Sequence, residues 1–93
     1  MFEFMLFISG QSARSRRIIS DLESFLSDEL GGQYTLRIVD VIEHPHIAQE
    51  NGILATPTLL KTSPPPKRIL GDLSGKRKVL DQLGLGPRPK PSR

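Results

Sequence analysis

Residues 2–41 read FEFMLFISGQSARSRRIISDLESFLSDELGGQYTLRIVDV. From Phe2 to Ile8 the apolar residues occupy both faces of a period-two pattern, which indicates a strand covered on both sides. Residues 13–30 repeat apolar side chains every three or four positions and predict a helix with one buried face. Residues 34–41 are rich in β-branched residues and predict a second strand. A strand, a helix and a strand within about 40 residues form a βαβ unit, whose strands run parallel.

Short polar segments bound the predicted helix. Ser12 precedes its first turn, and the serine hydroxyl is suited to cap a helix N-terminus. Gly31 and Gly32 follow its last turn and favour its end there. The predicted apolar face consists of Ile18, Leu22, Phe25, Leu26 and Leu30.

The second half of the chain begins with a short helix and a third apolar run. Pro45 is suited to begin a helix that runs to about Asn51, and Gly52 ends it. Residues 53–60 read ILATPTLL. Because proline cannot donate to a strand ladder, Pro57 confines this run to a sheet edge or a special turn.

Two further elements complete the order. Residues 68–70 predict a short fourth strand after the rigid interruption at Pro64, Pro65 and Pro66. Residues 74–83 have helical periodicity and predict a final helix with basic residues on its outer face. The resulting order, βαβαββα, resembles the thioredoxin arrangement, so we expect a single α/β domain of that kind.

Composition excludes several classes of function. The chain has 93 residues, of which 37% are hydrophobic and 25% charged, and it contains no cysteine. Without cysteine it has no disulfides, thiolate metal sites, thiol nucleophiles or dithiol redox chemistry. No apolar run approaches the roughly 20 residues that cross a bilayer. We therefore expect a cytoplasmic protein that is not an enzyme, carries no cofactor or metal and does not engage a membrane.

The net charge of +3 comes from the last residues of the chain. Residues 1–83 hold ten Lys and Arg and ten Asp and Glu, whereas Arg88, Lys90 and Arg93 alternate with prolines. Such a segment cannot bury enough apolar surface to become ordered. We expect a folded domain over residues 1–85 and a disordered basic tail over residues 86–93, and no nucleic-acid binding. A nucleic-acid or membrane-surface binder that uses this tail stays open as an alternative.

Three motifs carry a resemblance to a known family. They are GILATPTL at residues 52–59, the triple proline at residues 64–66, and ILGDLS at residues 69–74. In this order and spacing, with a first strand that ends in FISG at residues 7–10, they resemble the KaiB family. The resemblance covers about residues 4–85.

The resemblance implies a non-enzymatic component of the bacterial circadian clock. It implies binding to KaiC, a hexameric ATPase, together with sequestration of KaiA and competition with a clock-output histidine kinase. The KaiB family is metamorphic: one state is thioredoxin-like and binds KaiC, and the other rearranges the second half and forms a tetramer.

Two departures from the family pattern favour the thioredoxin-like state. The segment between Pro66 and Gly71 is one residue shorter than usual, which shifts the faces of any strand formed there. Gly84 is placed to end the final helix near Leu83. We therefore predict a monomer in the thioredoxin-like state, with the tetrameric KaiB ground-state fold as the alternative.

The partner-binding surface is expected at the short helix and the basic residues around the prolines. The helix is too short to be mostly core and exposes polar residues, and the basic positions match those of the family. The predicted partner-binding residues are His46, Gln49, Glu50, Asn51, Lys61, Lys67 and Arg68.

A second set of residues is expected to form the switch and its turns. Its members are Pro57, Pro64, Pro65, Pro66, Gly71 and Asp72. We expect a cis bond before Pro57, from the thioredoxin-like setting, and a rigid hinge at the triple proline, since prolyl isomerisation is slow.

Other interpretations stay open at three places. Asp72 and Ser74 either cap the last helix or hold a peptide backbone, as in redox-inactive thioredoxin-like modules that bind a peptide or glutathione. His44 and His46 are expected at the surface rather than as a metal pair. The arginines at positions 14, 16 and 17 form either a solvated face or a contact to an acidic partner.

Overall fold

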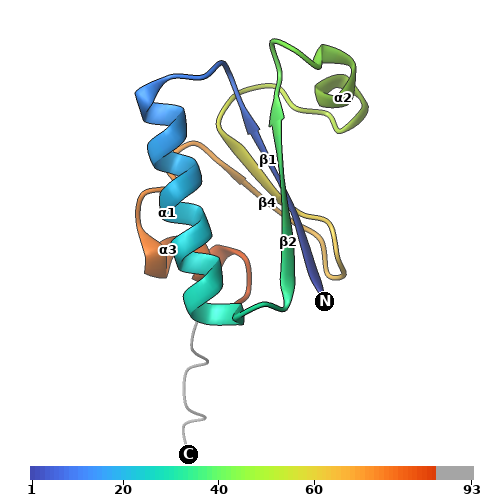
Figure 1. Cartoon of the computed structure of the whole chain (residues 1–93). Coiled ribbons are helices and arrows are strands. Elements are labelled where there is room, and N and C mark those ends of the chain that lie inside the picture. The colour runs from blue at the N-terminus through green and yellow to red at the C-terminus, as the bar shows by residue number, and fades with distance from the viewer. Residues whose placement is uncertain (86–93) are drawn as a thin grey trace, which may run out of the picture.

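Four strands form one mixed sheet, in which residues 34–40, 2–8, 58–61 and 67–70 lie side by side in that order. A computed structural model describes residues 1–85 of the chain (Figure 1). The elements are β1 (Phe2–Ile8), α1 (Ala13–Leu30), β2 (Tyr34–Asp40), α2 (Pro45–Glu50), β3 (Thr58–Lys61), β4 (Lys67–Leu70) and α3 (Lys76–Gln82). β1 runs parallel to β2 and antiparallel to β3, and β3 runs antiparallel to β4. The predicted βαβαββα order is confirmed, and the tail predicted over residues 86–93 lies outside the described residues.

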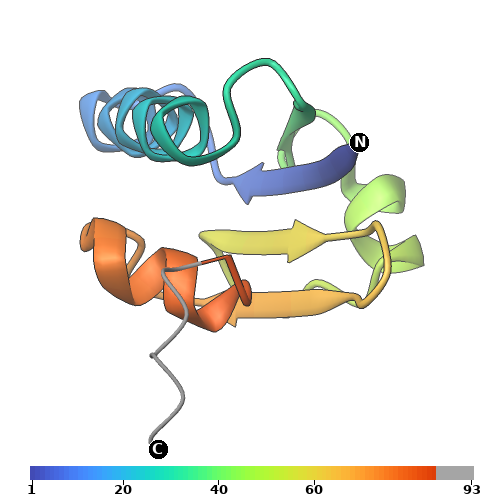
Figure 2. The same ribbon diagram turned by 90° about the horizontal axis from the view of Figure 1, so that it is seen from below.

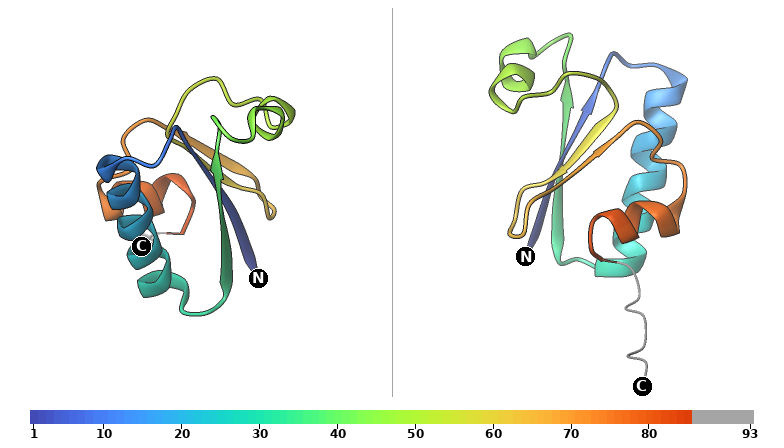
Figure 3. Two further views of the ribbon diagram at one scale, coloured as in Figure 1. Left: turned by 45° about the horizontal axis from the view of Figure 1, so that its top comes forward. Right: turned by 180° about the vertical axis from the view of Figure 1, so that it is seen from behind.

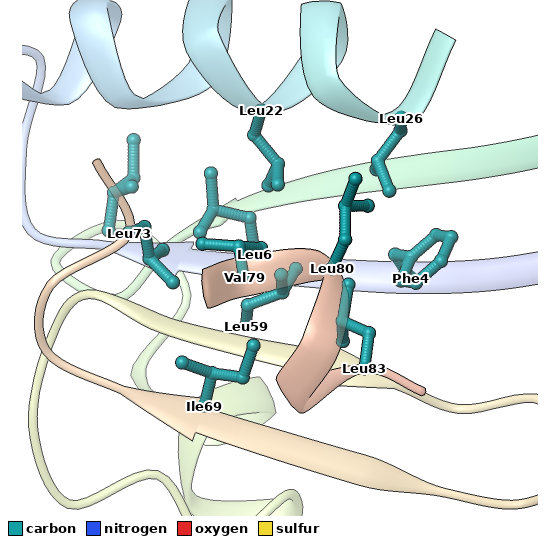
Figure 4. Close-up of a cluster of buried hydrophobic side chains, with 11 residues drawn as sticks. Phe4, Leu6, Leu22, Leu26, Leu59, Ile69, Leu73, Val79, Leu80 and Leu83 are labelled. Atoms are coloured by element: carbon teal, nitrogen blue, oxygen red, sulfur yellow. The ribbon is translucent and has the colours of Figure 1, made fainter. Parts of the chain in front are cut away.

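The helices α1 and α3 cover one face of the sheet (Figure 2). Their apolar side chains, among them Leu22 and Leu26 of α1, point toward β1 and β3 (Figure 4). This main core is formed by Phe4, Leu6, Ile8, Leu22, Leu26, Leu59, Ile69, Leu73, Val79, Leu80 and Leu83. This core packs the sheet, α1 and α3 against one another, and α2 and the loops are attached to these elements.

Within residues 1–85, α2 is the one helix on the opposite face of the sheet (Figure 2). This six-residue helix packs through Ala48 onto Phe7, Val39 and Leu60. It stands at the end of the sheet where β1 and β2 finish, away from α1 and α3 (Figure 3). Strand residues alternate between the two faces, so β1 and β3 supply apolar side chains to both cores.

Local hydrogen bonds explain where the helices begin and end. The Ser12 hydroxyl accepts from the backbone N–H of Ser15 at 3.0 Å, as predicted for an N-cap. At the end of α3, Leu85 N donates to Leu80 O, and Gly84 has a φ of 76°. This pair of features is a Schellman ending, so Gly84 stops the helix as predicted.

The buried carboxylate of Asp40 joins the two loops that follow the parallel strands β1 and β2. Asp40 Oδ1 accepts from the backbone N–H groups of Gly10 and Ile42, both at 3.0 Å. The β1–α1 loop and the β2–α2 loop are thereby held together at the end of the sheet where β1 and β2 finish and α2 lies.

Three sequence predictions differ from the structure in detail. The apolar run over residues 53–60 forms a strand only from Thr58, and this strand, β3, is interior; Pro57 lies in the turn before it, the second of its two expected placements, so its missing N–H falls outside the ladder. α3 begins at Lys76, two residues later than predicted. Its N-cap is Gly75, which has no side chain to accept a hydrogen bond, so neither Asp72 nor Ser74 caps it.

No helix in residues 1–85 combines the length and apolarity that crossing a membrane requires.

Candidate functional site

The C-terminal end of α2 meets the edge strand β4. The Arg68 guanidinium donates from Nη2 to the carbonyl of Asn51 at 2.9 Å and from Nη1 to that of Gly52 at 3.2 Å. The Asn51 side chain donates to the Ile47 carbonyl at 2.9 Å and completes the end of the helix. Two of the predicted partner-binding residues, Asn51 and Arg68, are thus brought together from 17 positions apart.

The outer face of α2 is polar and open to solvent. His46, Gln49 and Glu50 are exposed, whereas Ala48 is buried against the sheet. The rings of His44 and His46 lie 6.4 Å apart at their centroids, edge to face. Within residues 1–85, no three His, Asp or Glu side chains are close enough to hold a metal ion together.

The loop after α2 exposes apolar side chains that the sequence did not single out. Leu54 is 96% exposed and Ile42 is 67% exposed. Leu54 borders a hollow of about 200 Å³ that is also lined by Val41, Ala48, Ile53, Ala55 and Thr56. The signal available in the sequence was misleading here, because Leu54 sits in a continuous apolar run that favours a buried strand. Leu54 and Ile42 thus leave apolar surface open to solvent near the polar face of α2.

Lys61 lies inside the molecule, which corrects its expected role as an exposed electrostatic contact. It is only 3% exposed, and its Nζ donates to the carbonyls of Ser63 at 2.9 Å and Pro65 at 3.0 Å. Nζ also lies 5.6 Å from the centroid of the Phe2 ring. A buried ammonium needs such partners to offset its desolvation, so Lys61 holds the β3–β4 loop and is not available to a partner.

Lys67 is exposed but lies apart from α2. It pairs with Lys61 in the β3–β4 register, whereas Arg68 pairs with Leu60, so the two neighbours point to opposite faces of the sheet. A Cβ on Gly84 would lie 3.8 Å from Lys67 Cε, which places the lysine stem beside the end of α3. The predicted basic residues therefore do not form one patch.

Three of the predicted switch and turn residues, Pro57, Gly71 and Asp72, lie at a second place, between the start of α1 and the segment after β4. The Thr56–Pro57 bond is cis, as predicted, and the Pro64–Pro65 bond is cis as well. Gly71 N donates to the Pro57 carbonyl at 3.1 Å, and this bond joins the loop before β3 to the end of β4. Pro64, Pro65 and Pro66 are exposed in the separate β3–β4 loop.

Asp72 and Ser74 form a local turn beside a groove. Asp72 Oδ1 accepts from Ser74 N at 2.9 Å and from Ser74 Oγ at 2.6 Å, and these bonds lower the pKa of the Asp72 carboxyl. A groove of about 560 Å³ is lined by Ala13, Arg14, Arg17, Ile18, Asp21, Gly71, Asp72, Leu73 and Ser74. A second hollow of about 200 Å³ shares Arg14 and Ile18 with it and reaches Thr56 and Pro57.

Residues 5–85 match the KaiB domain family. The chain belongs to the KaiB family. It is 46% identical over 81 residues to the circadian clock oscillator protein KaiB of Rippkaea orientalis, across 86% of this chain and 78% of the relative. It is 45% identical over 83 residues to the circadian clock protein KaiB3 of Synechocystis sp., across 88% of this chain and 81% of the relative.

Solved structures show that this KaiB-family chain is thioredoxin-like. The N-terminal domain of Synechococcus elongatus SasA has a TM-score of 0.71 at 20% identity, over 88% of this chain and 78% of that domain. Chloroplastic thioredoxin z has a TM-score of 0.70 at 18% identity, over 91% of this chain and 78% of that protein. Identities this low establish the shared fold alone. The predicted family and the predicted thioredoxin-like fold are both confirmed.

Proposed function

We propose that this KaiB-family chain is a non-enzymatic clock protein that binds a KaiC-type hexameric ATPase. The binding site is the α2 surface, which we define as His46, Gln49 and Glu50 of α2, the adjoining Asn51, and the exposed apolar residues Leu54 and Ile42. The observation that carries the proposal is the exposure of Leu54 beside a polar helix held against β4. A buried apolar anchor within a polar rim is the usual composition of a protein–protein interface.

The thioredoxin-like state supports this proposal, since the family resemblance assigns KaiC binding to that state. We propose further that the chain acts in the cytoplasm as a monomer, and that the complex recruits KaiA and excludes a clock-output histidine kinase. Lys61 takes no part in the contact, because its ammonium is buried.

A titration tests the proposal. The chain, labelled at an added residue before Met1, is titrated with the KaiC-type hexamer from the organism that carries it, and fluorescence anisotropy is recorded. Saturable binding that an excess of unlabelled chain reverses is the expected result. The absence of binding at every nucleotide state of the ATPase would refute the proposed function.

The groove beside Asp72 favours one second candidate, a redox-inactive module that binds glutathione or a peptide. Its lining places two guanidinium groups, Arg14 and Arg17, with the Asp72 carboxylate around one space, which suits a ligand with both carboxylate and amino groups. The second hollow, which shares Arg14 and Ile18 with the groove, is lined by Thr56 and Pro57. Titration with glutathione, followed by amide chemical shifts, tests this candidate. Saturable shifts at residues 56 and 71–74 would support it, and unchanged shifts would exclude glutathione.

A further inference from the structure

We infer that Arg68 is a positioning residue for the α2 surface. Its guanidinium holds the C-terminal end of α2 in place, and binding of the ATPase depends on that hold rather than on an ionic contact between Arg68 and the partner. The inference rests on the proposed function for its binding readout, and on the geometry of the free chain for the rest.

The two hydrogen bonds of Arg68 are directed at groups that the helix itself cannot satisfy. The last carbonyls of any helix lack intrahelical partners and carry the negative end of the helix dipole. Asn51 O and Gly52 O lie at that end of α2, 2.9 Å and 3.2 Å from the two terminal nitrogens of the guanidinium. A planar guanidinium donates to two neighbouring acceptors at once, which an ammonium at a single point does not.

α2 has few other attachments to the sheet. It is six residues long, and a helix of this length has little stability of its own. Ala48 is its one buried residue, and Ile47 is half-buried. The chain leaves the helix through Gly52 into a loop that exposes Leu54. Ile53, the residue before Leu54, packs against the same core, and the two Arg68 bonds add a hydrogen-bonded tie from β4 to this end of the helix.

The placement of Arg68 on β4 makes the contact specific to this arrangement of strands. Arg68 reaches the helix end from the strand beyond β3, across its register partner Leu60, which packs under α2. If Arg68 instead met the partner directly, its positive charge would be the property that matters. If it positions α2, the fork of donors matters, because both acceptors are uncharged carbonyls.

Arg68→Lys separates these two roles, since it keeps the charge and loses the fork. Arg68→Gln removes the charge as well, and Arg77→Gln is the control for a lost charge, because Arg77 is exposed on α3, the helix that covers the other face of the sheet with α1 (Figure 2). Two quantities are measured for each variant: the affinity for the KaiC-type hexamer, and amide hydrogen exchange of the free chain. Thermal unfolding of each variant establishes that it is folded.

We expect Arg68→Lys and Arg68→Gln to lose affinity alike, by about tenfold if the competent position of α2 falls to about a tenth of the population. Arg77→Gln should stay within about twofold, because it removes an exposed charge away from the α2 surface. In free Arg68→Lys, amides 51–53 should exchange faster while those of β1 and β2 keep their protection. Affinity retained in Arg68→Lys but lost in Arg68→Gln would overturn the inference in favour of a direct ionic contact.

Unchanged exchange at residues 51–53 in Arg68→Lys would overturn it too, whatever the affinity. The exchange measurement needs no partner. If the native chain fails to bind the ATPase, the proposed function falls, and the hold of Arg68 on α2 is still decided by exchange alone.

Discussion

Lys61 Nζ lies 3.0 Å from the carbonyl oxygen of Pro65 and donates a hydrogen bond to it across the β3–β4 loop. The same nitrogen donates to the carbonyl of Ser63, so one buried ammonium spans both sides of the proline-rich turn. A lysine that the sequence assigns to a partner surface is instead an internal tie between β3 and the loop that leads to β4. The stability of the hairpin, rather than binding, should respond to its removal.

Replacement of Lys61 by Met tests that role. Met fills a similar volume without a donor, so the loop carbonyls lose their partner and the free energy of unfolding should fall by about 1–3 kcal/mol. Lys67→Met, at the exposed register partner, should change it by no more than about 0.5 kcal/mol. Urea denaturation followed by circular dichroism measures both. Equal losses in the two variants would show that the hydrogen bonds of Lys61 do not stabilise the loop.

Leu54→Asp should separate binding from folding. Leu54 is 96% exposed, so its replacement should leave the free energy of unfolding within about 0.5 kcal/mol of the native value. If Leu54 is the apolar anchor of the α2 surface, a charge there should weaken binding to the KaiC-type hexamer by about thirtyfold, as for an interface hot spot.

The matched control for the new charge is Ser24→Asp, on the exposed side of α1 and therefore on the other face of the sheet. That variant should bind as the native chain does. Equal affinities for Leu54→Asp and Ser24→Asp would remove Leu54 from the interface.

Asp72 should titrate at lower pH than an ordinary aspartate. Its hydrogen bonds from the side chain and backbone of Ser74 favour the charged form and lower the pKa of the carboxyl. Because the folded-state pKa is depressed, the stabilising contribution is complete above the unfolded value of about 3.9 and is lost as the pH falls through the folded value. Carboxyl carbon chemical shifts measured against pH test this, with Ser74→Ala as the control. A midpoint for Asp72 unaffected by Ser74→Ala would contradict the stated cause.

The chain should be a monomer that holds the thioredoxin-like state without a partner. Gly84 ends α3 in a Schellman motif, and Val79, Leu80 and Leu83 of that segment fill the main core. Sedimentation should give the mass of one chain, and backbone chemical shifts should be helical over residues 76–82. A tetramer, or strand-like shifts across this segment, would show that the other state of the family dominates.

Patterns among neighbouring residues were sufficient to predict the first half of the fold. The boundaries of β1 and α1 were predicted because alternation, the Ser12 cap and the Gly31 ending are all signals carried by neighbouring residues. The run at residues 53–60 favours a buried strand throughout, and apart from Pro57 nothing in it marks where a loop ends and a strand begins. Its division into an exposed loop and the interior strand β3 depends on the sheet that forms around it.

The candidate site was predictable only in outline. The polar face of α2 follows from the shortness of the helix and its side chains. The burial of Lys61 and the contact of Arg68 with the end of α2 cannot be predicted from the sequence in this way. Both side chains donate to backbone carbonyls, which every residue has, so the residue types do not reveal the pairing. Leu54 was missed for the converse reason: hydrophobicity predicts burial, and an exposed leucine is recognised only once the loop has a shape.

Hydrogen exchange of the complex with the KaiC-type hexamer tests the central claim most directly. Exchange is compared between the free and bound chain at every amide of residues 1–85. The account predicts that new protection concentrates on α2 and the loop through residue 55, while the outer face of α1 and the β3–β4 loop exchange as in the free chain. Protection confined to α1, α3 or the β3–β4 loop, or none at all, would contradict it.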